Sequence, residues 1–135
     1  AEICRAAGAN IASINYHFHS KEALYREVFE HVAQRVESAW PIDGGLPASA
    51  PPERRLRAFI EALLGRTYSE GAEGYLHRIL MSERFSPTGL LDSFLESTLA
   101  RHRAHINGVL RELLGPEATE ETVLWCEMCL VGQCM

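Results

Sequence analysis

The sequence predicts an all-α protein, on three observations. Apolar residues recur every three or four positions along most of the chain, as on one face of a helix. Glycine, proline and small polar residues separate these periodic segments. No stretch shows the strict alternation that is typical of a β-strand. The length of 135 residues allows one ordinary domain, or a small module fused to a modest helical body.

The first segments, residues 2–7 and 11–18, are predicted to be two short helices. Gly8 follows the first of them and can adopt the left-handed conformation that ends a helix. Asn10 stands where its side-chain oxygen can accept a hydrogen bond from the first amides of the second helix. The second helix is too short to be stable alone, so it must pack against another element.

A long amphipathic helix is predicted over residues 20–40. Ser20 can cap it, without a full capping box because Ala23 stands where Glu or Gln would complete one. The expected apolar stripe repeats every four residues: Leu24, Val28, Val32 and Val36, with Tyr25 and Phe29 one step round. Pro41 ends the helix. Helix, glycine-containing turn, short helix, cap and long helix is the layout of a helix-turn-helix DNA reader.

The residues of this segment also resemble a known family signature. Ala6-Ala7-Gly8, Ser13-Ile14, Phe18 and Ser20-Lys21-Glu22-Ala23-Leu24-Tyr25 match at the same spacing the DNA-binding region of tetracycline-repressor (TetR) family transcriptional regulators. The match covers about twenty residues, so it is more specific than a helix-turn-helix pattern alone. One departure is Asn15, where that family usually carries a phosphate-binding tyrosine.

The resemblance implies that the short second helix enters the major groove of DNA. Ile14 and Phe18 are four residues apart and are expected to anchor it to the module. The side chains expected to contact DNA are Asn10, Ile11, Ala12, Ser13, Asn15, Tyr16, His17 and Lys21. Asn and Ser suit base edges and phosphates, Ile and Ala can meet a thymine methyl, and Lys21 is expected to hold a phosphate.

The rest of the chain is predicted to be a helical body. Residues 41–52 are rich in Pro, Gly and Ala and form a loop. Further helices are expected from residue 53, over 75–85, over 90–114 with Thr88 as a cap, and from Thr119 onward. The last is apolar on most sides, which predicts burial in a core or against a second subunit.

Chemistry other than binding is not indicated. His102 and His105 are three apart, but Arg101 and Arg103 flank them, which disfavours a metal cation. Cys126-x-x-Cys129 lacks the second pair of ligands that zinc needs, so free thiols are expected. No nucleophile has a base and an orienting group beside it. The sequence therefore predicts no enzyme, no metal site and no cofactor.

Charge and chain ends set further expectations. The formal net charge of −5 gives no support to DNA binding, which the signature alone carries. The chain begins without a methionine and ends within an apolar helical pattern, so we expect it to be part of a longer protein. No apolar run reaches the roughly 20 residues of a membrane span, and a cytoplasmic protein is expected.

The sequence thus predicts a DNA-binding transcriptional regulator, most simply a homodimeric repressor released from its operator by a small apolar effector. Its expected domains are residues 1–25, a partial reader, and 26–135, for ligand binding and dimerisation. By the resemblance, the candidate effector-binding residues are Phe59, Leu63, Tyr68, Leu76, His77, Leu80, Met81, Phe94, Thr98 and His102. The alternatives are a helical small-molecule-binding or dimerisation module that does not read DNA, and a metal- or thiol-dependent helical enzyme.

Overall fold

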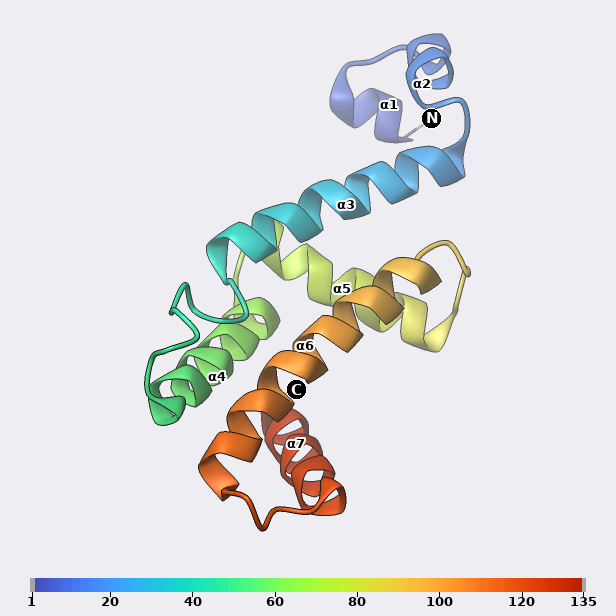
Figure 1. The fold of residues 1–135 in the computed structure, drawn as a ribbon. Coiled ribbons are helices and arrows are strands. Elements are labelled where there is room, and N and C mark those ends of the chain that lie inside the picture. Colours follow the sequence, from blue (N-terminus) through green and yellow to red (C-terminus); the bar gives the residue numbers. More distant parts are fainter. Residues whose placement is uncertain (1, 135) are drawn as a thin grey trace.

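The computed structural model describes residues 2–134, apart from the side chains of residues 11, 13, 14, 72 and 73. This part of the chain forms seven helices and no strand, as expected (Figure 1). They are α1 (Glu2–Ala7), α2 (Ile11–Phe18), α3 (Lys21–Ala39), α4 (Pro52–Tyr68), α5 (Ala72–Phe85), α6 (Asp92–Leu114) and α7 (Glu120–Cys134).

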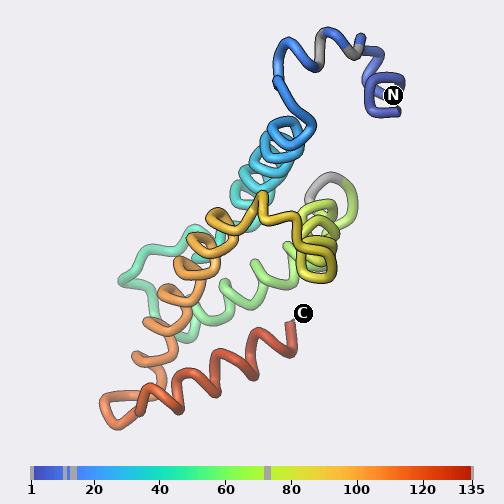
Figure 2. The backbone as a smooth tube through the Cα atoms, turned by 90° about the vertical axis from the view of Figure 1, so that its right-hand side faces the viewer, coloured from blue at the N-terminus to red at the C-terminus, as the bar shows by residue number. Residues whose placement is uncertain are grey.

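The two short helices stand apart from the body of the molecule. α1 and α2 lie beyond the first turn of α3, at the opposite end from α7, in both views (Figures 1 and 2). α2 contacts α3, α3 packs against α5, and α4 packs against both α5 and α6. α7 folds back along α6 and also touches α4. α3 is therefore the element that joins the N-terminal module to the helical body.

One apolar core holds α4, α6 and α7 together. It is built from one loop residue and one stripe of each helix: Ile42, Phe59, Ala62, Ile106, Val109, Leu110 and Val123. Phe59, Ile106, Val109 and Val123 are at most 2% exposed. Each fully buried side chain of this size contributes about 1.5–3 kcal/mol, so this stripe holds α4 and α7 on α6.

A second core attaches α3 to the body. Its buried residues are Phe29, Val36, Leu76 and Leu91. The ring of Phe29 meets that of Phe94 edge to face, with centroids 4.9 Å apart. Val28, which the four-residue repeat predicted to face inward, is 48% exposed, and Tyr25 packs at the edge of the core instead. The buried stripe thus follows mixed spacings of four and three residues, because 3.6 residues make a turn.

Several helix ends differ from the sequence expectation. Pro52 is the first residue of α4, one residue earlier than predicted, as suits a proline at N1. α5 begins at Ala72 rather than Tyr75, and α6 begins at Asp92. Thr88 is not the cap of α6: its hydroxyl accepts from the amide of Leu90, 3.2 Å away, within the preceding turn. Thr119 does cap α7, accepting from the amide of Thr122 at 3.1 Å.

α7 buries only one face within this chain. Val123 and Glu127 point into the body, while Leu124, Trp125 and Met128 are 41%, 58% and 55% exposed. The core of the same chain thus covers only the inner face of this helix, and burial of its outer face against a second subunit stays a prediction. No helix in the described part of the chain combines the length and apolarity needed to cross a membrane.

Candidate DNA-binding and effector sites

The N-terminal module has the local geometry of a helix-turn-helix. Gly8 adopts a φ of 62°, which ends α1 as expected. The Asn10 side chain accepts a 3.0 Å hydrogen bond from the amide of Ala12 and caps α2. Ser20 accepts one of 3.0 Å from the amide of Ala23 and caps α3. His19 turns the chain between α2 and α3 with a φ of 61°, a conformation uncommon outside glycine.

The expected DNA-contacting face of α2 is open where it is described. Ala12, Asn15, Tyr16 and His17 are exposed, and so is Lys21 at the start of α3. The side chains of Ile11, Ser13 and Ile14 lie outside the described residues, so the predicted contacts of Ile11 and Ser13 and the anchoring role of Ile14 stay predictions. Phe18, the other expected anchor, is half-buried.

A buried polar cluster ties the first half of α3 to the α5–α6 turn. Glu83, only 6% exposed, accepts a 2.7 Å hydrogen bond from the hydroxyl of Tyr25. It also accepts from the amide and hydroxyl of Thr88 at 3.0 Å. The Thr88 amide is the main cause that holds the pKa of Glu83 below its usual value. Burial first, and then the bond to Glu83 and its charge, raise the pKa of Tyr25 to about 12.

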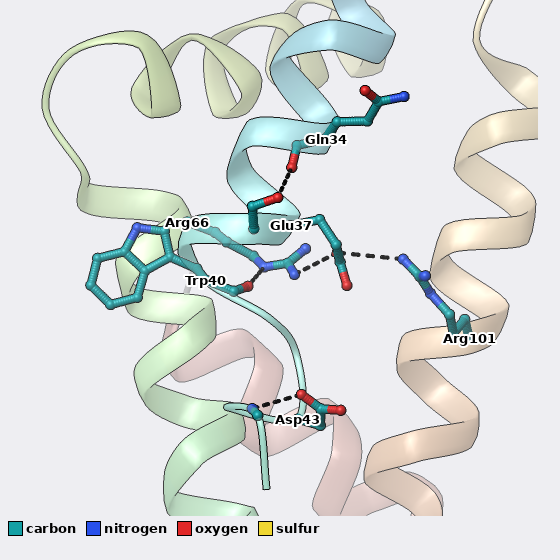
Figure 3. A network of polar contacts seen from close by, with 8 residues as sticks. Gln34, Glu37, Trp40, Asp43, Arg66 and Arg101 are labelled. Atoms are coloured by element: carbon teal, nitrogen blue, oxygen red, sulfur yellow. Dashed lines mark hydrogen bonds and ion pairs between the residues drawn. The ribbon is translucent and has the colours of Figure 1, made fainter.

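A second polar cluster joins the end of α3 to α4 and α6. Glu37 binds Arg66 of α4 at 2.7 Å and Arg101 of α6 at 3.4 Å (Figure 3). Arg66 also donates from Nε to the carbonyl of Trp40, the residue that ends α3, at 2.8 Å. Because the Arg66 side chain is only 13% exposed, this pair is screened by water less than a surface pair.

Two family comparisons match this architecture. The sequence model described as "Bacterial regulatory proteins, tetR family" matches residues 1–28, the module of α1, α2 and the start of α3. The model described as "HTH-type transcriptional dual regulator CecR, C-terminal domain" matches residues 52–135, which is more than half of the chain. The chain is a TetR-family transcriptional regulator. No curated protein and no solved structure matched in the two other comparisons.

Membership of the TetR family confirms two expectations from the sequence. The resemblance of residues 6–25 is confirmed by the match to residues 1–28, and the family is one of DNA-binding transcription regulators. It is also a non-enzymatic family, which confirms that the protein is not an enzyme.

In the described residues, no three His, Cys, Asp or Glu side chains gather as metal ligands would, and the four cysteines are free thiols.

His102 faces the polar cluster at the end of α3. Its Nε2 is buried and has no hydrogen-bond partner among the described residues. Burial first, and then the positive charge of Arg66, lower its pKa to about 4; Glu37 opposes the shift in part. The imidazole is therefore neutral near pH 7. Its Nε2 can accept or donate one hydrogen bond according to tautomer.

The ten candidate effector residues fall in two places in this TetR-family body. Phe59 and Leu63 belong to the core of α4, α6 and α7, whereas Leu76, Leu80 and Phe94 belong to the core beneath α3. His77, Met81, Thr98 and His102 are half-buried, and Tyr68 is 68% exposed. The structure thus places five of the ten candidates in two separate cores, and the role of all ten in binding stays a prediction.

Apolar periodicity in the sequence did not reveal the charged residues that lie on the buried faces of the helices. Glu83 follows Ile79 and Leu80 on the inner face of α5, and Glu127 follows Val123 on that of α7. Glu127 binds Arg103 at 2.7 Å, and the buried Arg55 of α4 binds Glu112 of α6. The sequence did hold a signal for these ion pairs: a charged residue at a position of the apolar stripe. A charge that is buried there requires a partner.

Proposed function

We propose that the protein is a homodimeric repressor whose binding to operator DNA is released by a small, largely apolar effector. The observation that carries the proposal is the position of α3. Its first turn follows the exposed reader helix α2, and its last turn is held to α4 and α6 through Glu37. A ligand that prefers one arrangement of the body would thereby shift the reader.

The proposed reader surface comprises the DNA-contacting residues named from the sequence, with Asn15, Tyr16 and Lys21 at its exposed face. The side-chain oxygen of Asn10 already accepts the capping hydrogen bond from the amide of Ala12. The 25/26 boundary between the proposed domains falls inside α3, a single helix from Lys21 to Ala39. Such a continuous helix can transmit a rigid movement from one domain to the other.

The proposed dimer uses α7 and the distal half of α6. Leu124, Trp125 and Met128 of α7 and Leu114 of α6 are each more than two-fifths exposed. Exposed apolar side chains gathered in this way are typical of an interaction surface. Two readers are also needed, because a single short helix contacts few base pairs and such proteins bind paired half-sites.

The proposed effector site lies along α6, with His102 as its polar anchor. The unpartnered Nε2 of His102 would gain a hydrogen bond from a ligand, and the neighbouring half-buried Thr98 offers a second polar group. Most of the other candidate residues are apolar, as is usual for small-molecule sites. His102 also lies beside Arg66 and Glu37, so a ligand bound there would act directly on the end of α3.

The test has two stages. Duplexes that bind the purified protein are first selected from a random pool, and their affinity is measured by fluorescence anisotropy at several salt concentrations. Hydrophobic compounds are then screened for release of the selected duplex. Saturable release by one compound supports the proposal, and failure to select any duplex favours the helical module without DNA binding. The matched domain is named for a dual regulator. A compound that strengthens DNA binding, rather than releasing the duplex, would therefore favour a role other than the proposed effector-released repressor.

A further inference from the structure

A groove lies between the α3–α4 loop and α4. Its volume is about 390 Å³, within the range of small-molecule sites. Trp40, Leu46, Ala58 and Ala62 supply apolar walls, and the charged residues of the lining are Arg54, Arg57 and Glu61. None of the ten candidate effector residues lines it. Figure 3 shows the indole of Trp40 extending beside α4, and the backbone carbonyl of Trp40 turned toward Arg66.

The walls of the groove are held in place by close packing. A Cβ on Gly65 would lie 2.3 Å from the Trp40 ring, so the indole rests directly on the α4 backbone. A Cβ on Gly44 would lie 2.6 Å from the Cβ of Ala58, which brings the loop equally close to the helix. Ile42 anchors the same loop in the core. A ligand would therefore meet a largely formed surface and would pay little ordering entropy.

The two arginines of the lining, Arg54 and Arg57, outweigh its one carboxylate, Glu61, so the charge of the groove favours an anion. The Arg54 side chain has no ionic partner among the described residues. Arg57 has only Glu61, at 3.9 Å, and both side chains of that pair are more than three-fifths exposed. Exposed pairs of this kind contribute little free energy, so Arg57 is free to turn toward a ligand. Guanidinium groups bind carboxylates in a two-pronged geometry, and indole rings stack on aromatic groups.

We propose that this groove binds a small carboxylate with an aromatic body, stacked on Trp40 and paired with Arg54 and Arg57. The site is separate from the proposed effector site along α6. It would bind its ligand whether or not the protein is on DNA, so its existence does not depend on the proposed function. Its position at the end of α3 places the ligand next to the Trp40–Arg66–Glu37 cluster.

The proposal is tested by the fluorescence of Trp40 in a Trp125→Phe background, where it is the single tryptophan. The probes are hydrocinnamate and its neutral amide, hydrocinnamamide, which differ in charge but hardly in shape. Hydrocinnamate should give a saturable change, and the amide should bind about tenfold more weakly. Arg54→Gln should weaken hydrocinnamate by about tenfold and leave the amide unchanged. Arg84→Gln, an exposed arginine of α5 outside the groove, is the matched control.

The proposal is overturned if acid and amide bind equally, if Arg54→Gln and Arg84→Gln have the same effect, or if no saturable signal appears. Should Trp125→Phe fail to fold, the same two probes and two arginine variants are compared by calorimetric titration of the protein with both tryptophans. Operator affinity, measured separately with and without hydrocinnamate, distinguishes failure of this site from failure of the proposed repressor function.

Discussion

The hydroxyl of Tyr25 donates a 2.7 Å hydrogen bond to the buried carboxylate of Glu83, although the two residues are 58 positions apart. Tyr25 lies one turn inside α3, just after the reader, and Glu83 lies near the end of α5. The bond therefore fixes α3 to the body at the end that follows α2. The Glu37 cluster does the same at the far end. α3 is consequently held to the body near both of its ends.

Tyr25→Phe should lower the free energy of unfolding by about 1.5–3 kcal/mol, because the carboxylate of Glu83 loses a charge-assisted donor in a buried place. Chemical denaturation near pH 7 measures the effect. Tyr16→Phe, at a 78% exposed position on α2, is the matched control and should change stability little. Equal stability of the two variants would mean that the Thr88 bonds alone satisfy Glu83.

Gly65→Ala should destabilise the protein although alanine favours helices over glycine by about 1 kcal/mol. The added methyl would lie 2.3 to 2.6 Å from three atoms of the Trp40 ring, so the indole must leave its place on α4. Gly108→Ala is the control, since nothing lies within 4 Å of its Cβ position in α6. Thermal unfolding should show Gly108→Ala higher and Gly65→Ala lower than the natural protein. A rise in both would show that the loop yields easily.

The parts of the fold that depend on nearby residues could be predicted from the sequence. The caps Asn10 and Ser20 and the left-handed Gly8 follow from chemistry within three residues of each position, and the structure confirms them. Ile106 and Val109 of α6, three residues apart on one helix face, both lie in the core.

Features that depend on distant partners could not be predicted in this way. Thr88 is of a residue type that often caps helices, yet its amide and hydroxyl donate hydrogen bonds to Glu83. Glu83 in turn accepts a hydrogen bond from Tyr25, 58 residues away in the sequence. Val28 fits a four-residue repeat, yet the position of α5 determines that Phe29 is buried in its place. The groove beside Trp40 requires Gly44 and Gly65 to be placed against Ala58 and the indole, which periodicity does not reveal.

Lys21→Ala should weaken binding to all duplexes by a similar factor and reduce the slope of log affinity against log salt by about one. Lys21 is exposed at the first position of α3, where a phosphate contact would not depend on sequence. Anisotropy titrations of selected and scrambled duplexes over a salt series measure both quantities. An unchanged slope would remove Lys21 from the DNA contacts.

Replacing Leu124 and Val131 of α7 with glutamate should produce monomers, seen by sedimentation, because charges would be buried at the proposed dimer face. Leu124 is 41% exposed in the single chain and Val131 is half-buried. Gln133→Glu, at an exposed polar position of the same helix, is the control for added charge. Dimers that persist at low concentration would mean that the subunits pair through another surface.

His102→Leu should reduce the loss of stability on acidification. The folded-state pKa of about 4 is below the ordinary value of 6.5, so the unfolded chain takes up a proton first as the pH falls. Stability is therefore fully present above about pH 6.5 and declines toward pH 4, through this residue, because protonation favours the unfolded chain. Unfolding midpoints between pH 7 and 5 should fall less in His102→Leu than in the natural protein. His31→Leu, at an exposed position of α3, controls for the loss of a histidine.

The same His102→Leu variant tests the proposed effector anchor at neutral pH. Leucine keeps the apolar contacts of the ring but cannot hydrogen-bond, so a ligand that uses Nε2 should lose about 1 kcal/mol or more, roughly a fivefold weaker affinity. Folding should be nearly unchanged, since Nε2 has no partner to lose among the described residues. The concentration of effector that releases half of the bound duplex measures the change. If stability at pH 7 falls strongly while that concentration stays the same, His102 serves packing at the end of α3, and the anchor must be sought among the other candidates.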